Sequence, residues 1–185
     1  MAGRDSQAEP LDSGRDLGPA ADPEAVARAI VLRKLTGQAR SRRELEDALA
    51  AKRVPAEVSA RVLDRFTEVG LINDAAFAEA WVQSRFSSRG LAGRALAQEL
   101  RRKGVDDALV RSTVDAIDAG QERNQARSLV DRKLNATRSL DREKRFRRLT
   151  AMLARKGYST AVSMSVVREA LAADEQLSEC SAANP

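Results

Sequence analysis

Apolar residues recur along the chain at the spacing of one face of an α-helix. The clearest series has apolar side chains at positions i, i+4, i+8 and i+11, namely Val58, Val62, Phe66 and Val69. Such a spacing places them on one side of a helix with 3.6 residues per turn. Similar series recur at 110–117 and 146–153. No alternating Val, Ile or Thr run is long enough to predict a β-strand, so the pattern predicts an all-α protein.

Residues that start and stop helices divide this pattern into nine segments. Ser41 and Glu44 form a capping box, in which two side chains satisfy free backbone N–H groups at a helix start. Gly70, Gly104 and Gly157 stand where helices are expected to end. The helices are predicted at 24–36, 41–52 and 55–69, at 74–87, 91–103 and 106–118, and at 121–136, 141–156 and 159–172.

One short pattern of basic and leucine residues occurs three times at nearly constant spacing. Its copies are Arg43, Leu45, Leu49 and Lys52, then Arg94, Leu96, Leu100 and Lys103, then Arg147, Leu149, Leu153 and Lys156. Each copy lies in the second of three short helices, so the repeating unit is a three-helix unit. We expect units at 24–72, 73–120 and 121–172, arranged as an elongated tandem array in which neighbours stabilise one another.

The charge of the chain is distributed unevenly. The net charge is +5, but residues 121–172 hold thirteen basic and five acidic side chains, a net of +8. Residues 1–23 and 173–185 each carry −3. We expect both to be disordered acidic tails, because they have few bulky apolar side chains to offset the entropy of ordering. The basic third unit favours a polyanionic partner or an acidic protein groove, although a charged run can equally be a solvated surface.

The composition argues against an enzyme. The chain has no histidine and one cysteine, Cys180, which excludes histidine bases, Cys–His nucleophiles, imidazole metal sites and disulfide frameworks. Dinucleotide, phosphate-loop and zinc-protease motifs are absent as well. We therefore expect no catalysis, cofactor or metal. No apolar run approaches the length of a membrane span, and a single cysteine is typical of the reducing cytoplasm.

Basic residues at repeated positions are the candidate binding residues. Arg43, Arg94 and Arg147 recur near a helix start, where the helix dipole disfavours a cation, so a binding role is plausible for them. Arginine also suits carboxylate and phosphate, since its planar fork donates two hydrogen bonds at once. The recurring lysines lie near helix ends, where a cation stabilises the helix itself. The candidate contacts are Arg43, Arg94, Arg101, Arg102, Lys103, Arg145, Arg147 and Arg148.

The aromatic residues have two interpretations. Phe77 and Trp81 lie one helical turn apart and could form a stacking platform for single-stranded nucleic acid. Their spacing also fits the core of the second unit, which is the interpretation we favour. Tyr158 takes the repeat position of Val54 and Val105, so we expect it to be a core residue too.

Two stretches resemble the most characteristic motifs of the RecX family. The first is GLINDAAFA at 70–78, followed by Trp81, Ser84 and Arg85; the second is ELRRKGV at 99–105. The stretch RSRREL at 40–45 is similar to the signature of the family's first unit. With the threefold period, the resemblance covers about residues 24–172. The third unit is more diverged, and the acidic N-terminal tail is not part of the family pattern.

The resemblance implies a fold and a function. Members of the family are bacterial regulators of the RecA recombinase, built from tandem three-helix units, and act in recombination, DNA repair and the SOS response. They bind in the groove of the RecA–DNA filament and suppress strand exchange, ATP hydrolysis and co-protease activity. The resemblance implies the same role here, for a monomer that contacts RecA directly and DNA weakly or through the filament.

Two alternatives remain open at this stage. One is a helix-turn-helix-like DNA-binding protein that acts without RecA, because a helix of each unit could enter a major groove. The other is a scaffold repeat for a different acidic protein.

Overall fold

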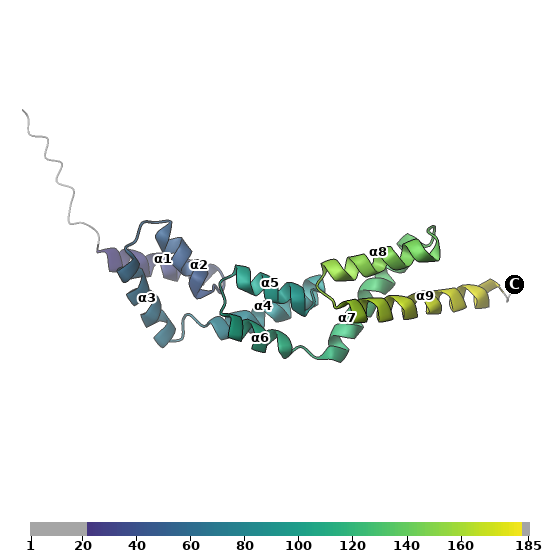
Figure 1. Cartoon of the computed structure of the whole chain (residues 1–185). Coiled ribbons are helices and arrows are strands. Elements are labelled where there is room, and N and C mark those ends of the chain that lie inside the picture. Colours follow the sequence, from purple (N-terminus) through teal and green to yellow (C-terminus); the bar gives the residue numbers. More distant parts are fainter. Residues whose placement is uncertain (1–21, 183–185) are drawn as a thin grey trace, which may run out of the picture.

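The protein is an elongated row of three helical units (Figure 1). The computed structural model describes residues 22–182, and this part of the chain contains nine α-helices, one short 3-10 helix and no strand. The all-α fold and the elongated array of three three-helix units, both predicted from the sequence, are confirmed.

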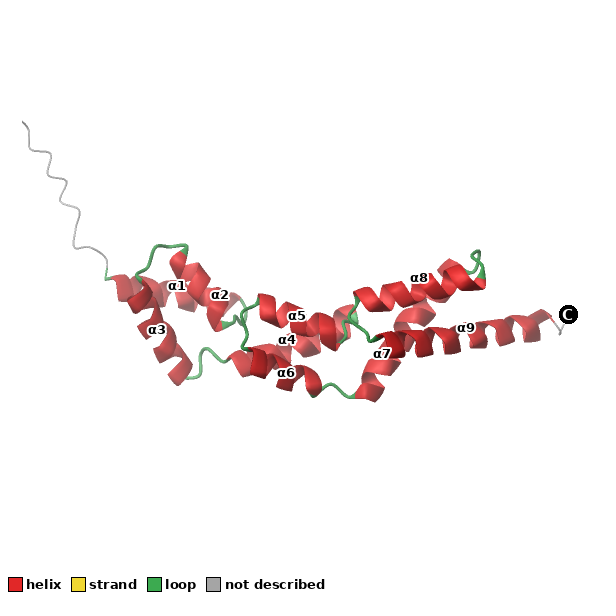
Figure 2. Cartoon of the chain, viewed as in Figure 1, coloured by secondary structure: helices red, strands yellow, loops and turns green. Residues whose placement is uncertain are grey.

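Each unit contributes three consecutive α-helices, joined by short loops (Figure 2). The first unit contains α1 (Pro23–Gly37), α2 (Arg42–Ala50) and α3 (Ala56–Glu68). The second contains α4 (Asp74–Arg89), α5 (Gly93–Arg102) and α6 (Asp107–Asp115). The third contains α7 (Ala119–Leu134), the 3-10 helix η1 (Asn135–Thr137), α8 (Arg142–Arg155) and α9 (Thr160–Ala182). Wherever two helices pack extensively against each other, both belong to the same unit.

Polar side chains cap the N-terminal ends of most of the helices. The capping box is present: the Ser41 hydroxyl accepts a hydrogen bond from the Glu44 N–H at 3.2 Å, and the Glu44 carboxylate accepts one from the Ser41 N–H at 3.3 Å. Side chains that accept hydrogen bonds in the same way begin α1, α4, α6, α7 and α8, namely Asp22, Asn73, Asp106, Asp118 and Asp141. These caps satisfy backbone donors that a helix start leaves free.

The two ends of the array differ from the sequence prediction. Residues 173–185 are predicted as a disordered tail, but α9 continues to Ala182, so this prediction is wrong for 173–182. The reason is a buried contact: Asp174 accepts hydrogen bonds from Arg145 and Arg138, which hold the extended helix against the third unit. Most of the tail predicted at 1–23 lies outside the described residues. Its last two residues, Asp22 and Pro23, cap and begin α1.

Each unit has its own hydrophobic core. The core of the second unit is built from Phe77, Leu96, Leu100, Val105 and neighbouring residues, with Trp81 packed against it. Tyr158 is buried with the leucines of α8 in the third unit. The core role expected for these aromatic residues is therefore confirmed.

We expect Leu100→Ala to lower the free energy of unfolding by roughly 2–5 kcal/mol. Leu100 is fully buried, so its truncation leaves a cavity that the surrounding helices fill only in part. Urea unfolding followed by circular dichroism measures the change. Leu32→Ala is the matched control, because Leu32 is about half exposed, and its effect should stay within about 0.5 kcal/mol. Equal losses for the two variants would contradict the core assignment.

Candidate functional site

Contacts at equivalent repeat positions join the first unit to the second and the second to the third. In joint 1, the end of α5 meets the start of α2: the Ser41 hydroxyl donates to the Lys103 carbonyl at 2.5 Å, and the Lys103 ammonium donates to the Glu44 carboxylate at 2.6 Å. In joint 2, the end of α8 meets the start of α5. There the Ala92 N–H donates to the Lys156 carbonyl at 2.8 Å, and the Lys156 ammonium donates to the Arg89 carbonyl at 2.6 Å. The repeated lysines thus hold successive units together.

A glycine follows each joint lysine and allows the close approach. Gly104 and Gly157 have φ angles of +74° and +93°, which disfavour any side chain. A Cβ at Gly104 would also collide with the Arg43 side chain, and one at Gly157 with the backbone of Ala95. Arg53 takes the corresponding place in the first unit with a φ of +58°, but it is exposed and no other unit packs on it in the described part of the chain.

The stretches that resemble RecX motifs build joint 1. The Trp81 indole N–H donates to the Glu99 carboxylate at 2.9 Å. The Arg85 guanidinium and the Lys103 ammonium lie over its ring, 4.2 and 4.6 Å from the centroid. Asp74, at the start of α4, accepts a hydrogen bond from the Arg42 N–H at 2.8 Å. The Trp81 ring therefore already has two cations of the protein over it, which argues against a free stacking platform.

Electrostatics strengthen joint 1. Burial alone raises the pKa of the Glu44 carboxyl, but the hydrogen bonds from Lys103 and the Ser41 backbone outweigh it. The positive charges of Lys103 and Arg40 act in the same direction, so the pKa of Glu44 lies below its ordinary value. Glu44 is thus held as a carboxylate that attracts the lysine of the following unit.

Joint 2 combines polar and apolar contacts. The Tyr158 hydroxyl donates to the Gly90 carbonyl at 3.3 Å, and burial, with a smaller contribution from the charge of Glu122, raises the pKa of Tyr158 to about 12. Ala92 is part of the third unit's core, and the Gln125 amide donates to the Phe86 carbonyl at 3.2 Å. The loop before α5 is therefore anchored in the third unit.

Arg145 is a correction to the set of candidate contacts. Its side chain is only 9% exposed and donates to the Asp174 carboxylate at 2.7 Å. Arg138 pairs with the same carboxylate at 3.1 Å. The hydrogen bond from Arg145, followed by that from Arg138, holds the pKa of Asp174 below its ordinary value despite the opposing effect of desolvation. Arg145 is a structural residue of the third unit and is not available to a partner.

The other candidates differ in how far they are already paired. Lys103 lies in joint 1. Arg43 pairs with Asp47 at 3.2 Å, and Arg101 pairs with Asp107 at 2.7 Å. Three of the remaining arginines are exposed, namely Arg94, Arg102 and Arg147. Arg94 and Arg102 have no ion pair among the described residues, and Arg147 has a long one of 3.9 Å to Glu143.

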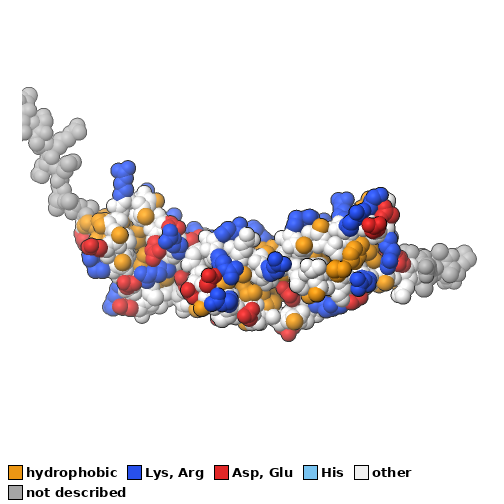
Figure 3. Space-filling model, viewed as in Figure 1, with side chains coloured by type: hydrophobic (Ala, Val, Ile, Leu, Met, Phe, Trp, Pro, Cys, Tyr) orange, Lys and Arg blue, Asp and Glu red, His pale blue; other side chains and the backbone are white. Residues whose placement is uncertain are grey.

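Arg148 is exposed as well, and within residues 22–182 it has no ion-pair partner. The second helices α2, α5 and α8 follow one edge of the row (Figure 1). Figure 3 shows Lys and Arg side chains along this edge, including the part over α5 and α8. Exposed arginines of the second and third units therefore belong to the helices that follow this edge, where a long anionic or acidic partner can approach.

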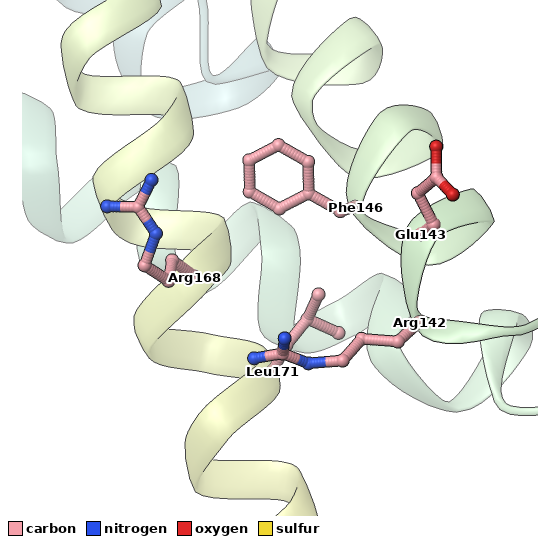
Figure 4. A pocket seen from close by; sticks show the side chains of 5 residues that line it. All are labelled: Arg142, Glu143, Phe146, Arg168 and Leu171. Carbon is pink, nitrogen blue, oxygen red and sulfur yellow. The ribbon is translucent and has the colours of Figure 1, made fainter.

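Two recesses lie between helices of the third unit at its surface. The α8–α9 recess, of about 350 Å³, is lined by Arg142, Glu143, Phe146, Arg168 and Leu171. Figure 4 shows Phe146 and Leu171 facing this space, with the Arg168 and Arg142 side chains beside it. Arg142 is already paired with Glu175 at 2.8 Å. This recess is mainly apolar and suits an apolar side chain of a protein partner.

The α7–α8 recess, of about 230 Å³, is different in character. Its lining residues are Lys133, Ala136, Thr137, Arg148, Leu149, Met152 and Arg155. Lys133 and Arg155 are functional candidates that the sequence reasoning missed. Arg155 follows Arg148 by seven residues and so shares its helix face, which was a usable signal. Lys133 lies on another helix, and only the fold brings it to this recess.

Neither a metal centre nor a membrane span is found in the part of the chain that the structure describes. Its helices lack the combination of length and apolar character needed to cross a bilayer. It also contains no group of three or more acidic, cysteine or histidine side chains placed to hold a metal ion.

Comparison with known proteins identifies the family. Three family models match consecutive parts of the chain: the first three-helix domain of RecX at 27–66, the second at 73–113 and the third at 121–171. The chain belongs to the RecX family. This confirms the assignment inferred from the motifs around Trp81 and Lys103.

Individual RecX proteins agree with this assignment. Regulatory protein RecX of Streptomyces lividans is 60% identical over 153 residues, covering 83% of this chain and 81% of the relative. That of Thermobifida fusca is 54% identical over 166 residues, covering 87% and 90%. A crystal structure of RecX from Lactobacillus salivarius has the same fold, with a TM-score of 0.76 at 20% identity over 82% of this chain and 98% of that one. RecX proteins are regulators and not enzymes, so this chain has a regulatory role.

Proposed function

We propose that this protein binds the RecA–DNA filament and inhibits its strand exchange, ATP hydrolysis and co-protease activity. Its RecX family membership supports this role. The observation that carries the proposal is the extended row of three units held by two joints at equivalent repeat positions. A row of this form can contact successive subunits of a helical polymer, whereas a compact domain of equal size would contact fewer.

The mechanism follows from this shape and charge. Exposed arginines on α5 and α8 contact carboxylates of RecA or phosphates of its DNA, because guanidinium groups donate paired hydrogen bonds to both. A chain that bridges neighbouring subunits opposes the motions that accompany nucleotide turnover, or blocks filament growth. RecA hydrolyses the ATP, and the regulator acts as a monomer in the bacterial cytoplasm, in recombination, repair and the SOS response.

We expect the full chain to inhibit the DNA-stimulated ATPase of RecA at or below a stoichiometric amount. Replacing Arg94, Arg102 and Arg147 together with glutamine should raise the concentration needed for half inhibition by roughly 10–100-fold. Three exposed charge pairs at about 0.5–1 kcal/mol each correspond to that range. A titration of the regulator into a coupled ATPase assay measures it.

A matched control removes the same charge from other faces. Arg33, Arg61 and Arg111 are exposed residues of α1, α3 and α6 and have no ion pair among the described residues. Their triple glutamine variant should inhibit nearly as well as the wild type. No inhibition by the wild type rejects the proposal. Tight, sequence-dependent DNA binding without any effect on RecA would instead favour the DNA-binding alternative.

A further inference from the structure

The α7–α8 recess gathers three cations around one small space. Lys133 comes from α7, and Arg148 and Arg155 come from α8. All three side chains are exposed, and in the part of the chain that the structure describes none of them has an ion-pair partner. None of the lining residues is acidic. The recess is therefore a concentrated positive site.

Several other cations of the third unit, in contrast, do have carboxylate partners. Arg123–Glu169 joins α7 to α9, and Arg142–Glu175 joins α8 to α9. Arg127–Asp131 lies within α7, and Lys144–Asp141 lies at the start of α8. Three like charges around one space repel one another. A bound anion would relieve that repulsion.

We propose that the α7–α8 recess binds a phosphate group of a nucleic-acid backbone. Arg148 and Arg155 donate paired hydrogen bonds to phosphate oxygens, and Lys133 adds a compact positive charge. Ala136, Leu149 and Met152 supply apolar wall beside these cations. The phosphodiester backbone of a nucleic acid matches this mixture, because the C–H surface of a sugar lies next to each charged phosphate.

Two further features favour a polymeric anion over a single carboxylate. Arg132 is exposed next to Lys133 and, in residues 22–182, has no ion pair, so the positive surface continues along α7 beyond the recess. The recess is also firmly built: Arg145 links α8 to Asp174 of α9 and lies 3.5 Å from the Thr137 hydroxyl of η1. These supports fix the positions of α8 and η1 before binding, so only the cationic side chains have to be ordered by the contact.

The inference can be tested apart from the RecA proposal, because it needs only this chain and DNA. We expect the full chain to bind a fluorescein-labelled 30-nucleotide single strand and the corresponding duplex in an anisotropy titration at low salt. The K133Q/R148Q/R155Q variant should bind at least about tenfold more weakly. The magnitude of its slope of log K against log salt concentration should fall by roughly 0.7–0.9, the amount expected for the loss of one phosphate contact.

The R33Q/R61Q/R111Q variant loses the same net charge from other faces and should bind DNA nearly as well as the wild type. Thermal melts of both variants establish that they are folded. Equal loss of DNA binding in the two variants would mean that net charge alone attracts DNA, and would overturn the proposal, as would unchanged binding by the recess variant. If labelled polyglutamate, and not DNA, loses affinity for the recess variant, the recess is a carboxylate site. Inhibition of RecA by the wild type decides the proposed function separately.

Discussion

Replacing Arg145 with methionine is expected to lower the free energy of unfolding by about 3–5 kcal/mol, the usual cost of removing one partner of a buried ion pair. Arg145 donates to Asp174 at 2.7 Å, and both side chains are about nine-tenths buried. The loss should lie near the lower end of the range, because Arg138 still reaches the same carboxylate. Urea unfolding followed by circular dichroism measures it.

Two further variants separate the buried pair from the general effect of losing an arginine. Arg148→Met removes an exposed, unpaired cation of the same helix and should change stability by no more than about 0.5 kcal/mol. Arg145→Met combined with Asp174→Leu should recover much of the loss, since no buried charge remains without its partner. A single Arg145→Met variant as stable as the wild type would show that the pair does not hold α9.

The contribution of this pair depends on pH in a defined direction. The hydrogen bonds from Arg145 and Arg138 hold the pKa of Asp174 below its ordinary value in the folded protein. Its stabilising effect is therefore fully present above the pKa of the unfolded carboxyl and is lost as the pH falls through the lower folded value. The stability difference between wild type and Arg145→Met should shrink accordingly in acid.

The sequence predicted the helices and units because their signals are local. The apolar spacing, the Ser41–Glu44 capping box and the glycines that end helices all act within one or two turns. The joints depend on residues far apart in sequence, such as Ser41 and Lys103. The recurrence of the joint lysines was visible, but their position near helix ends favoured a dipole interpretation. Only the fold shows that they hold the next unit.

The candidate contact residues of α8 also differ in how far the sequence could predict their environment. Arg145 and Arg148 stand three residues apart in one basic run, yet one is buried and the other exposed. Arg145 precedes Leu149 by four residues and Leu153 by eight, so helical periodicity places it on the apolar face. That signal was present in the sequence. The extension of α9 had no such signal, because its composition does not show that Asp174 meets two arginines.

Joint 2 provides the prediction with the largest effect on function: Gly157→Ala should reduce the inhibition of RecA by at least about tenfold. The new Cβ collides with the backbone of Ala95, which cannot rotate away as a flexible side chain can. Separating the second and third units breaks the contact of Lys156 with the end of α4 and that of Tyr158 with the loop before α5. Each unit keeps most of its own core, so helix content should remain near that of the wild type, while small-angle X-ray scattering should report a changed shape.

Gly70→Ala is the control that isolates the collision from backbone strain. Gly70 has a φ of +75°, close to that of Gly157, but its added Cβ would meet no atom within 4 Å. Both variants therefore suffer the cost of a side chain in the left-handed region, about 1 kcal/mol, and only Gly157→Ala disturbs a joint. If the units act as a rigid row on a filament, Gly70→Ala retains inhibition and Gly157→Ala loses it. Full inhibition by Gly157→Ala, together with an altered scattering curve, would show that the units bind independently and that their fixed arrangement is not needed for function.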